Sequence, residues 1–267
     1  LIIGAGLIGL KCAEALHHLN ADITVVDLAD RILPSILDVR AGEIMQKHIE
    51  DKGTKFILGT SVEQFSKNSA KLTNGETVDF DILVITVGVR PNTVHVSDAG
   101  GKVEKGIITD LHQQTTIDNV YAAGDCTVSH DCSSNTDRIL ALLPNAFMQG
   151  EVAGKNMAGE ETLYLNAIPM NAIGFYGLHI ITAGSYDGDE DITEDADKEI
   201  YKKLVFKDGL LKGFILMGDV ARAGIYTSMI KEQIPLTEVD LDLLRDKPQM
   251  MMFGKARREE KLAGKKH

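Results

Sequence analysis

The sequence predicts an α/β protein in which a doubly wound, Rossmann-like nucleotide-binding domain comes first and a small α+β domain comes last. Three observations support this prediction. An apolar strand at the start leads through a glycine-rich turn into an amphipathic helix, and the second apolar strand ends in an aspartate. The C-terminal third contains several short stretches of alternating apolar and polar residues, the pattern of half-buried strands.

The glycine-rich turn has the spacing Gly-x-Gly-x-x-Gly and is formed by Gly4, Gly6 and Gly9. In a dinucleotide-binding unit the first glycine permits the tight turn, the second lets the backbone approach a pyrophosphate, and the third lets the helix pack on the strand. The phosphates then lie at the helix N-terminus, here at Leu7 and Ile8, where free N–H groups favour negative charge. Helical spacing predicts the following buried face for this helix: Ile8, Cys12, Ala15, Leu16 and Leu19.

An acidic residue, Asp27, ends the second strand, Asp22–Asp27, about 20 positions after the glycines. A carboxylate at this place accepts hydrogen bonds from the ribose hydroxyls of the cofactor and repels a 2′-phosphate. Asp27 therefore favours NAD over NADP.

The remaining elements of residues 1–92 complete the predicted nucleotide-binding domain. We expect a helix over about 38–52, a strand over 55–58 and a small antiparallel excursion over 61–73. The run Phe80–Gly88 is predominantly apolar, which predicts a parallel strand buried on both faces. Pro91 stops this strand and marks an exit to another domain.

Composition and charge narrow the functional classes. The chain has 267 residues, enough for two domains, and its net charge of −11 argues against a nucleic-acid partner. Its apolar runs are shorter than the ~20 residues of a membrane span, so we expect a cytoplasmic protein without membrane contact. Cys12, Cys126 and Cys132 form neither an even disulfide set nor a metal-binding quartet, and we expect no metal site.

The middle of the chain contains a second candidate motif. Gly106–Asp110 predicts a strand, and the stretch Gln114–Asp125 ends in Ala-Ala-Gly-Asp, which we interpret as another strand end followed by an acid. A helix entered at Pro144 follows, and we expect its Phe147 and Met148 to pack in the core.

Beyond residue 160 the pattern becomes that of short strands. We expect strands over 164–170, 178–186, 199–207 and 210–217, with a hairpin turn at Asp208-Gly209 and a helix over 221–231. The acidic stretch 187–199 is interpreted as a solvated loop, with an acidic rim for a protein partner as the alternative. We expect 250–267 to be a poorly packed tail.

Five motifs follow one another between residues 4 and 125: G-A-G-L-I-G, V-V-D, R-I-L-P, T-V-G-V-R-P-N and T-T-I-D-N-V-Y-A-A-G-D. This combination resembles the FAD- and NAD-dependent pyridine nucleotide–disulfide oxidoreductase superfamily. Within it, the chain is similar to NADH–rubredoxin reductases and to the flavin-binding part of NADH-dependent nitrite reductases.

The resemblance implies a division of the chain. An NAD-binding domain would span 1–92, the C-terminal segment of an FAD-binding domain 93–159, an α+β domain of the dimerisation type 160–249, and a tail 250–267. It also implies an N-terminally truncated fragment, because the sequence has no second glycine-rich unit for the ADP half of FAD.

For the NAD site, the resemblance adds Arg31 and Gly88 to the glycines and Asp27. Lys11 departs from the family pattern, which commonly has Glu just after the third glycine, near the nicotinamide–flavin stack. Lys11 could therefore lie at this stack, and the alternative is a helix lysine that faces solvent.

For the FAD site, the resemblance implies that Asp125 accepts hydrogen bonds from the ribityl chain, with Gly124 allowing close approach. The helix led by Asn145 and Ala146 would aim its N-terminus at the flavin pyrimidine ring, where the helix dipole stabilises negative charge.

The implied activity is hydride transfer from NADH to FAD, followed by electron transfer to an acceptor such as rubredoxin or a nitrite-reducing partner. Such an oxidoreductase would be a homodimer whose partner is a small redox protein or another redox domain. Two alternatives stay open: an NADH oxidase, peroxidase or CoA-disulfide reductase, and a non-catalytic regulatory module that binds NAD or flavin.

Overall fold

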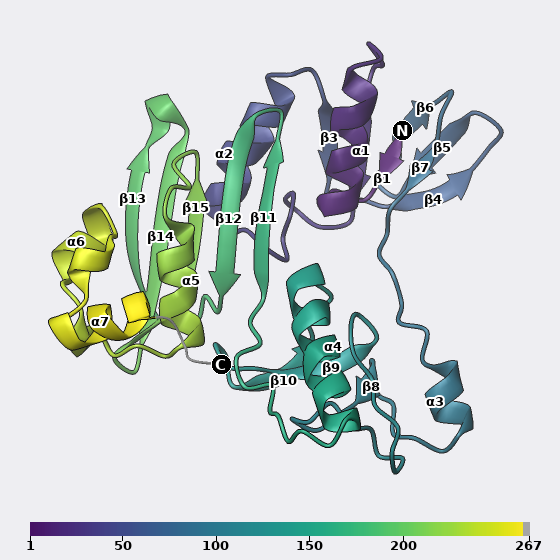
Figure 1. Cartoon of the computed structure of the whole chain (residues 1–267). Coiled ribbons are helices and arrows are strands. Elements are labelled where there is room, and N and C mark those ends of the chain that lie inside the picture. The colour runs from purple at the N-terminus through teal and green to yellow at the C-terminus, as the bar shows by residue number, and fades with distance from the viewer. Residues whose placement is uncertain (264–267) are drawn as a thin grey trace.

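The computed structural model describes residues 1–263, except for the side chain of Glu260, and shows a mixed α/β protein (Figure 1). The described residues form a four-stranded parallel sheet, two three-stranded sheets and a five-stranded antiparallel sheet. The expected combination of a parallel nucleotide-binding sheet with a C-terminal α+β part is confirmed.

The N-terminal part is built on the predicted strand, glycine turn, helix and strand. Its sheet has the order β3-β2-β1-β7, and every strand pair in it is parallel. Asp38 caps the second helix, because its side chain accepts a hydrogen bond from the Ala41 N–H. The elements are β1 (Ile2–Ile3), α1 (Leu7–His17), β2 (Thr24–Asp27), α2 (Val39–Glu50), β3 (Lys55–Leu58) and β7 (Val84–Ile85).

The two faces of this parallel sheet are covered differently. Successive strand residues point to opposite faces, so Ile2 and Val25 pack with α1 and α2, whereas Ile3 and Val26 pack with Leu72. Leu72 belongs to an antiparallel meander of β4 (Val62–Phe65), β5 (Ser69–Leu72) and β6 (Thr77–Asp79). The predicted antiparallel excursion is thus present, is longer by one strand, and covers the face opposite the helices.

The buried face of α1 differs from the prediction. Gly9, Leu10 and Ala13 are its buried residues, whereas Ile8 is 58% and Leu19 73% exposed. The position of Gly9 explains the difference, because the helix must turn this glycine toward the strand to pack closely. Hydrophobic spacing alone did not account for that constraint.

The expected strand over 80–88 is also shorter and more exposed than predicted. Only Val84–Ile85 form strand β7, and this strand lies at the edge of the parallel sheet. Ile85, Val87 and Val89 are 58%, 72% and 82% exposed. The expectation of burial on both faces was wrong here, because an apolar run does not show which elements cover a strand.

The middle part, 93–159, contains a small three-stranded sheet in the order β10-β9-β8 and the predicted helix at Pro144. The strand expected before Asp125 is absent, since this stretch forms only isolated bridges, between Thr109 and Thr115 and between Gln114 and Tyr121. Phe147 was expected in the core but is 73% exposed. The elements are α3 (Val94–Asp98), β8 (Ile107–Ile108), β9 (Thr127–Asp131), β10 (Thr136–Ile139) and α4 (Leu143–Met157).

The C-terminal part is a five-stranded antiparallel sheet in the order β11-β12-β15-β14-β13, followed by helices. The hairpin turn at Asp208-Gly209 and the helix near 221–231 are confirmed. The elements are β11 (Met170–Phe175), β12 (Leu178–Gly184), β13 (Asp189–Asp195), η1 (Ala196–Lys198), β14 (Ile200–Lys207), β15 (Leu210–Met217), α5 (Ala223–Lys231), η2 (Leu236–Glu238), α6 (Leu241–Asp246), η3 (Met250–Met252) and α7 (Lys255–Ala263).

Three expectations for this part were wrong. The first strand begins at Met170 instead of occupying 164–170, and the acidic loop contains strand β13. Charged side chains are compatible with β13 because it is an edge strand whose residues are mostly exposed. The start of the expected tail is packed, with Met252 and Phe253 each only 2% exposed. Residues 264–267 of that tail lie outside the described residues.

The five-stranded sheet is buried on both faces. One face contributes Phe175, Ile180 and Tyr201 to the same hydrophobic core as α1 and α2. The other face contributes Leu204 and Phe214 to a second core with α5, α6 and η3. Helices α1 and α2 therefore lie between two sheets, as Figure 1 shows.

Candidate functional site

The glycine-rich turn between β1 and α1 is closely packed at two positions and open at the third. Gly4 has φ +111°, and a Cβ atom there would lie 2.5 Å from the Thr86 carbonyl oxygen. A Cβ atom on Gly9 would lie 1.9 Å from the Gly4 carbonyl oxygen. A Cβ atom on Gly6 would meet no atom within 4 Å, so the turn has free space at the glycine expected to face a pyrophosphate.

Thr86 holds this turn from the neighbouring strand. Its hydroxyl donates a hydrogen bond to the Ile3 carbonyl at 2.9 Å, and it lies against both Gly4 and Gly9. Sequence reasoning missed Thr86 as a site residue, although its position directly after β7 gave a signal. Residues at the carboxyl ends of neighbouring parallel strands meet at the same edge of a sheet.

Asp27 joins the glycine turn to the loop after β2. Its Oδ2 accepts a hydrogen bond from the Ala5 N–H at 2.6 Å, and its Oδ1 accepts one from the Ala29 N–H at 2.8 Å. A carboxylate oxygen accepts more than one hydrogen bond, so these contacts leave capacity for ribose hydroxyls. The structure brings Asp27 to the glycine turn, as predicted.

The N-terminus of α1 is free to bind an anion. Gly6 is the N-cap residue, no side chain caps this helix, and its first turn contains no acidic residue. The N–H groups of the first turn have no acceptor within the helix, and the helix dipole adds partial positive charge. This arrangement fits the pyrophosphate of a dinucleotide.

Arg31 and Gly88 lie on the two loops that flank the turn. The loop with Arg31 is attached to the turn, because the Leu33 N–H donates to the Ala5 carbonyl at 3.0 Å. Nε of Arg31 is buried without a hydrogen-bond partner, which suits an acceptor from a bound ligand. Gly88 has φ +101° and free space around its Cα, so this position favours glycine and leaves room at the edge of the sheet.

The Ala-Ala-Gly-Asp turn lies against the start of α4. Gly124 has φ +91°, and a Cβ atom on it would lie 3.7 Å from Ala146 Cβ. The Gly124 N–H donates to Gln149 Oε1 at 2.6 Å, and the Thr127 hydroxyl donates to the Gly124 carbonyl at 2.8 Å. Asp125 is exposed. The structure thus brings Gly124 and Ala146 together, and Gln149 is a supporting residue that sequence reasoning missed.

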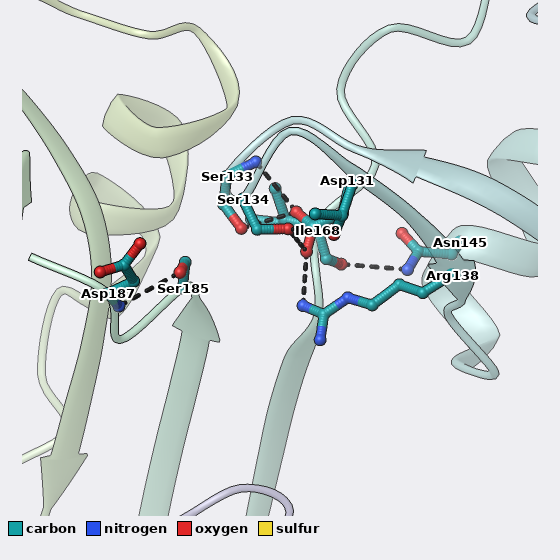
Figure 2. A network of polar contacts seen from close by, with 9 residues as sticks. Asp131, Ser133, Ser134, Arg138, Asn145, Ile168, Ser185 and Asp187 are labelled. Carbon is teal, nitrogen blue, oxygen red and sulfur yellow. Dashed lines mark hydrogen bonds and ion pairs between the residues drawn. The ribbon is translucent and has the colours of Figure 1, made fainter. Parts of the chain in front are cut away.

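The Asn145 side chain is buried, and both of its polar atoms form hydrogen bonds within the protein. It is 0% exposed, and its Oδ1 accepts a hydrogen bond from the Tyr164 hydroxyl at 2.9 Å. Its Nδ2 donates to the Ile168 carbonyl at 3.0 Å (Figure 2). Burial raises the pKa of the Tyr164 phenol, so Tyr164 remains a donor. Backbone N–H groups of α4, which has no side-chain cap, are left to contact a flavin.

Asp131, which is completely buried, forms a separate polar network beside Asn145 (Figure 2). Its carboxylate accepts hydrogen bonds from the Ser133 N–H at 2.9 Å, the Ser133 hydroxyl at 2.6 Å and the Ser134 hydroxyl at 2.9 Å, and forms an ion pair with Arg138. Burial opposes ionisation, but these contacts outweigh it and hold the pKa of Asp131 below its usual value. A carboxylate so fully bonded closes the β9–β10 hairpin and does not act as a proton donor.

Lys11 is exposed, and its ammonium group reaches toward the C-terminal sheet. Lys11 Nζ donates to the Gly174 carbonyl at 2.6 Å, pairs with Glu14, and lies 5.2 Å from the centre of the Phe175 ring. Burial opposes ionisation of Glu14, but hydrogen bonds from Lys11 and from the Tyr176 N–H outweigh it and lower the pKa of Glu14. Lys11 is therefore bound by protein groups on the side of α1 that meets β11.

Within residues 1–263, no cluster of three or more His, Cys, Asp or Glu side chains has the arrangement of a metal site. None of the helices in this part of the chain is long and apolar enough to cross a bilayer.

Comparison with protein families agrees with this geometry. Residues 1–150 match the family described as pyridine nucleotide-disulphide oxidoreductase, which is more than half of the 267 residues. The chain belongs to this family. Residues 169–234 match the family described as rubredoxin NAD+ reductase C-terminal domain. The predicted resemblance is thereby confirmed for both ends of the chain. FAD and NADH are the cofactors of this oxidoreductase family.

Three curated relatives align with most of the chain. The epsilon subunit of NADH-dependent phenylglyoxylate dehydrogenase of Aromatoleum evansii is 32% identical over 247 residues, covering 88% of this chain and 58% of that protein. Rubredoxin-NAD(+) reductase of Acinetobacter baylyi is 30% identical over 91% of this chain and 60% of its own length. Nitrite reductase [NAD(P)H] of Bacillus subtilis is 29% identical over 89% of this chain and 30% of its own length. The chain thus spans between 30% and 60% of the length of these relatives.

Solved structures of this oxidoreductase family share the fold. An NAD-dependent persulfide reductase from A. fulgidus superposes with a TM-score of 0.80 at 25% identity, covering 89% of this chain and 49% of that chain. The water-forming NADH oxidase from Lactobacillus brevis bound to NADH gives a TM-score of 0.81 at 23% identity, covering 89% of this chain and 59% of that chain. The second likeness concerns the fold alone.

Proposed function

We propose that this chain is the NADH-binding and flavin-contacting part of an FAD-dependent oxidoreductase. The enzyme passes hydride from NADH to FAD and then electrons to an acceptor. The observation that carries this proposal is the glycine turn, in which Gly4 and Gly9 have no room for a side chain and Gly6 faces free space beside an uncapped helix. Few structural needs other than a phosphate group explain that combination.

The residues of the chain would bind and orient the two cofactors. The first turn of α1 would hold the pyrophosphate of NADH, and Asp27, fixed by Ala5 and Ala29, would accept the ribose hydroxyls and exclude a 2′-phosphate. Asp125 would hold the ribityl chain of FAD, and the uncapped start of α4 would face its pyrimidine ring. The cofactors supply the hydride chemistry when bound, so the protein needs no nucleophile.

The C-terminal part favours a redox protein as acceptor over oxygen. The relatives named for nitrite and rubredoxin-NAD(+) reduction align with 89% and 91% of the chain, and the C-terminal match is to a rubredoxin NAD+ reductase domain. The NADH oxidase of Methanocaldococcus jannaschii is more similar, at 36% identity, but over 61% of the chain only. We infer a small redox protein or a further redox domain as partner, in a cytoplasmic homodimer.

A spectrum of the full natural polypeptide tests the proposal. We expect flavin absorption bands that bleach on anaerobic addition of NADH and respond much more weakly to NADPH, and we expect bleached enzyme to regain colour when an oxidised rubredoxin is added. Flavin bands that NADH leaves unchanged would instead support a non-catalytic module. Recovery by oxygen alone, at a rate that rubredoxin does not raise, would support an oxidase. Light scattering with size-exclusion chromatography tests the dimer.

A further inference from the structure

Tyr176, beside the C-terminal sheet, contacts several residues of the predicted nucleotide-binding part. It lies in the turn between β11 and β12, which Figure 1 shows beside α1 and α2. Its backbone has φ +49° and the following Gly177 has φ +90°, a left-handed conformation that non-glycine residues seldom adopt. Such a conformation persists where surrounding contacts fix it.

Four contacts fix Tyr176, one for each of its chemical groups. The backbone N–H donates to Glu14 Oε1 at 2.6 Å, and the backbone carbonyl lies 3.2 Å from His48 Nε2. The phenol oxygen lies 3.3 Å from Thr54 Oγ1, and the ring packs edge-on against His17 with centroids 5.3 Å apart. The four partners come from α1, α2 and the loop after α2.

Neighbouring contacts extend this attachment along α1. Lys11 Nζ donates to the Gly174 carbonyl, two residues before Tyr176, and His48 Nδ1 lies 2.8 Å from Glu199 Oε1 near β14. Lys11 and Glu14, and likewise Glu14 and His17, are neighbours on the helix surface, and all three contact residues 174–176. The side of α1 that carries them faces the β11–β12 hairpin.

The contacts with Tyr176 and the predicted cofactor site lie on the same helix, α1. Helix α1 has 11 residues, which makes it about 16 Å long. Its N-terminal end forms the glycine turn, and Glu14 and His17 near its C-terminal end hold Tyr176. A displacement of one end of a short helix also moves the other end, because the backbone hydrogen bonds keep the helix stiff.

We propose that Tyr176 is a positioning residue of the oxidoreductase, which fixes the orientation of α1, and with it the bound dinucleotide, relative to the rest of the protein. This inference rests on the proposed function, because orientation matters where a hydride must reach a flavin over a short distance. Binding of the dinucleotide at one end of α1 and order in the β11–β12 turn at the other end are then coupled.

The matched variants are Tyr176→Asn and Tyr176→Phe. Asparagine tolerates the left-handed conformation and forms a good two-residue turn with Gly177, so it preserves the hairpin while removing the ring and the hydroxyl. Phenylalanine retains the ring against His17 and removes the hydroxyl near Thr54 only. A purely structural role would predict that Asn preserves the rate of the folded enzyme.

Rapid-mixing measurement of flavin reduction provides the first test. At saturating NADH we expect Tyr176→Asn to reduce its flavin at least tenfold more slowly than the wild type, with the Kd for NADH changed less than twofold. Tyr176→Phe should stay within twofold in both quantities. An Asn variant that reduces its flavin at the wild-type rate would overturn the proposal.

Amide hydrogen exchange with and without NAD+ separates this inference from the proposed function. We expect NAD+ to protect both the start of α1 and the β11–β12 turn in the wild type, and the start of α1 alone in Tyr176→Asn. Protection of α1 without the turn in the wild type would contradict the coupling while leaving dinucleotide binding intact. Protection of neither segment would overturn NAD binding and the positioning role together.

Discussion

The two predicted cofactor sites are built in different ways. The glycine turn is supported from within residues 1–92, by Asp27, Thr86 and the packing of Gly9 on Gly4. The turn at Gly124 is supported by Gln149, and α4 is supported by Asn145 through residues near the start of the C-terminal sheet. Asp27 is bonded to backbone groups, whereas Asp125 is exposed.

The predicted nucleotide site is therefore fixed by nearby backbone contacts, while the predicted flavin site exposes Asp125 on a scaffold that more distant segments hold in place. We therefore expect substitutions in the first site to affect folding and binding together where packing is tight. In the second site, substitution of the supporting residues should change stability, and substitution of the predicted binding residue should change flavin binding alone. Four predictions test this comparison, in order of decreasing effect.

The largest effect is expected from Gly9→Ala. The new Cβ atom would lie 1.9 Å from the Gly4 carbonyl and 2.7 Å from Thr86 Oγ1, so the helix must move away from the strand. We expect a loss of about 3 kcal/mol or more in the free energy of unfolding. The matched control is Gly6→Ala, whose Cβ atom meets free space.

Gly6→Ala should keep the stability within about 1 kcal/mol and weaken NAD+ binding at least tenfold, because the methyl group occupies the expected pyrophosphate position. Urea unfolding and titration of NADH fluorescence measure the two quantities. Equal loss of stability in both variants would show that the turn is not selectively open at Gly6.

Asn145→Leu tests the support of the second site. It removes both hydrogen bonds of a completely buried amide and leaves the Tyr164 hydroxyl and the Ile168 carbonyl unpaired. We expect a loss of roughly 2–4 kcal/mol in unfolding free energy. Tyr164→Phe, which removes one of the two bonds, should cost about 1 kcal/mol. A chemical unfolding series compares them, and a neutral Asn145→Leu would mean that α4 is not held by this amide.

Asp131→Asn should show a stability loss that depends on pH. Because the folded pKa of Asp131 lies below its unfolded value, its charge stabilises the fold above about pH 4, and this contribution disappears as the pH falls through the folded pKa. We expect the variant to lose roughly 1–3 kcal/mol at pH 7 and to approach the wild type at lower pH. Thermal unfolding between pH 3 and 7 measures the gap, and a gap that stays constant would contradict the role of the charge.

The smallest effect on stability is expected from Asp125→Asn. The side chain is exposed, so the unfolding free energy should change by less than about 0.5 kcal/mol. Flavin content, measured from the absorbance of the purified full-length protein, should nevertheless fall, because an amide is a weaker acceptor for ribityl hydroxyls. A variant with normal flavin content would remove Asp125 from the site.

The sequence was most informative where a motif is local. The elements that carry Gly4, Gly9 and Asp27 lie where the sequence predicted, since a strand, a tight turn, a helix and a second strand follow one another within a few residues. Gln149 was missed because it contacts Gly124 across 25 positions of sequence, a separation that no local pattern reports. Thr86 was missed although it follows a strand, because the turn that it contacts lies 82 positions away and is identified only once the strand pairing is known.

Errors in the fold had a similar origin. The apolar run ending at Gly88 suggested a strand buried on both faces, but the burial of a strand depends on which elements pair with it and cover it. In the acidic stretch, pairing with β14 makes a strand of Asp189–Asp195 despite its charge. The side-chain partners of Asn145, which are Tyr164 and Ile168, lie in a segment whose position no motif indicated.

The core shared by the two large sheets also affects how the chain folds. Leu10, Ala41 and Met45, near the start, are buried against Tyr201, Ile215 and Met217. The Lys11 to Gly174 contact spans 163 positions, so the first core requires closure of a long loop, which slows folding. A ribosome must synthesise the chain beyond Met217 before that core is complete. Until then the apolar residues of α1 and α2 that pack on the C-terminal sheet are exposed. Chaperones that bind exposed apolar segments can bind the chain during this interval.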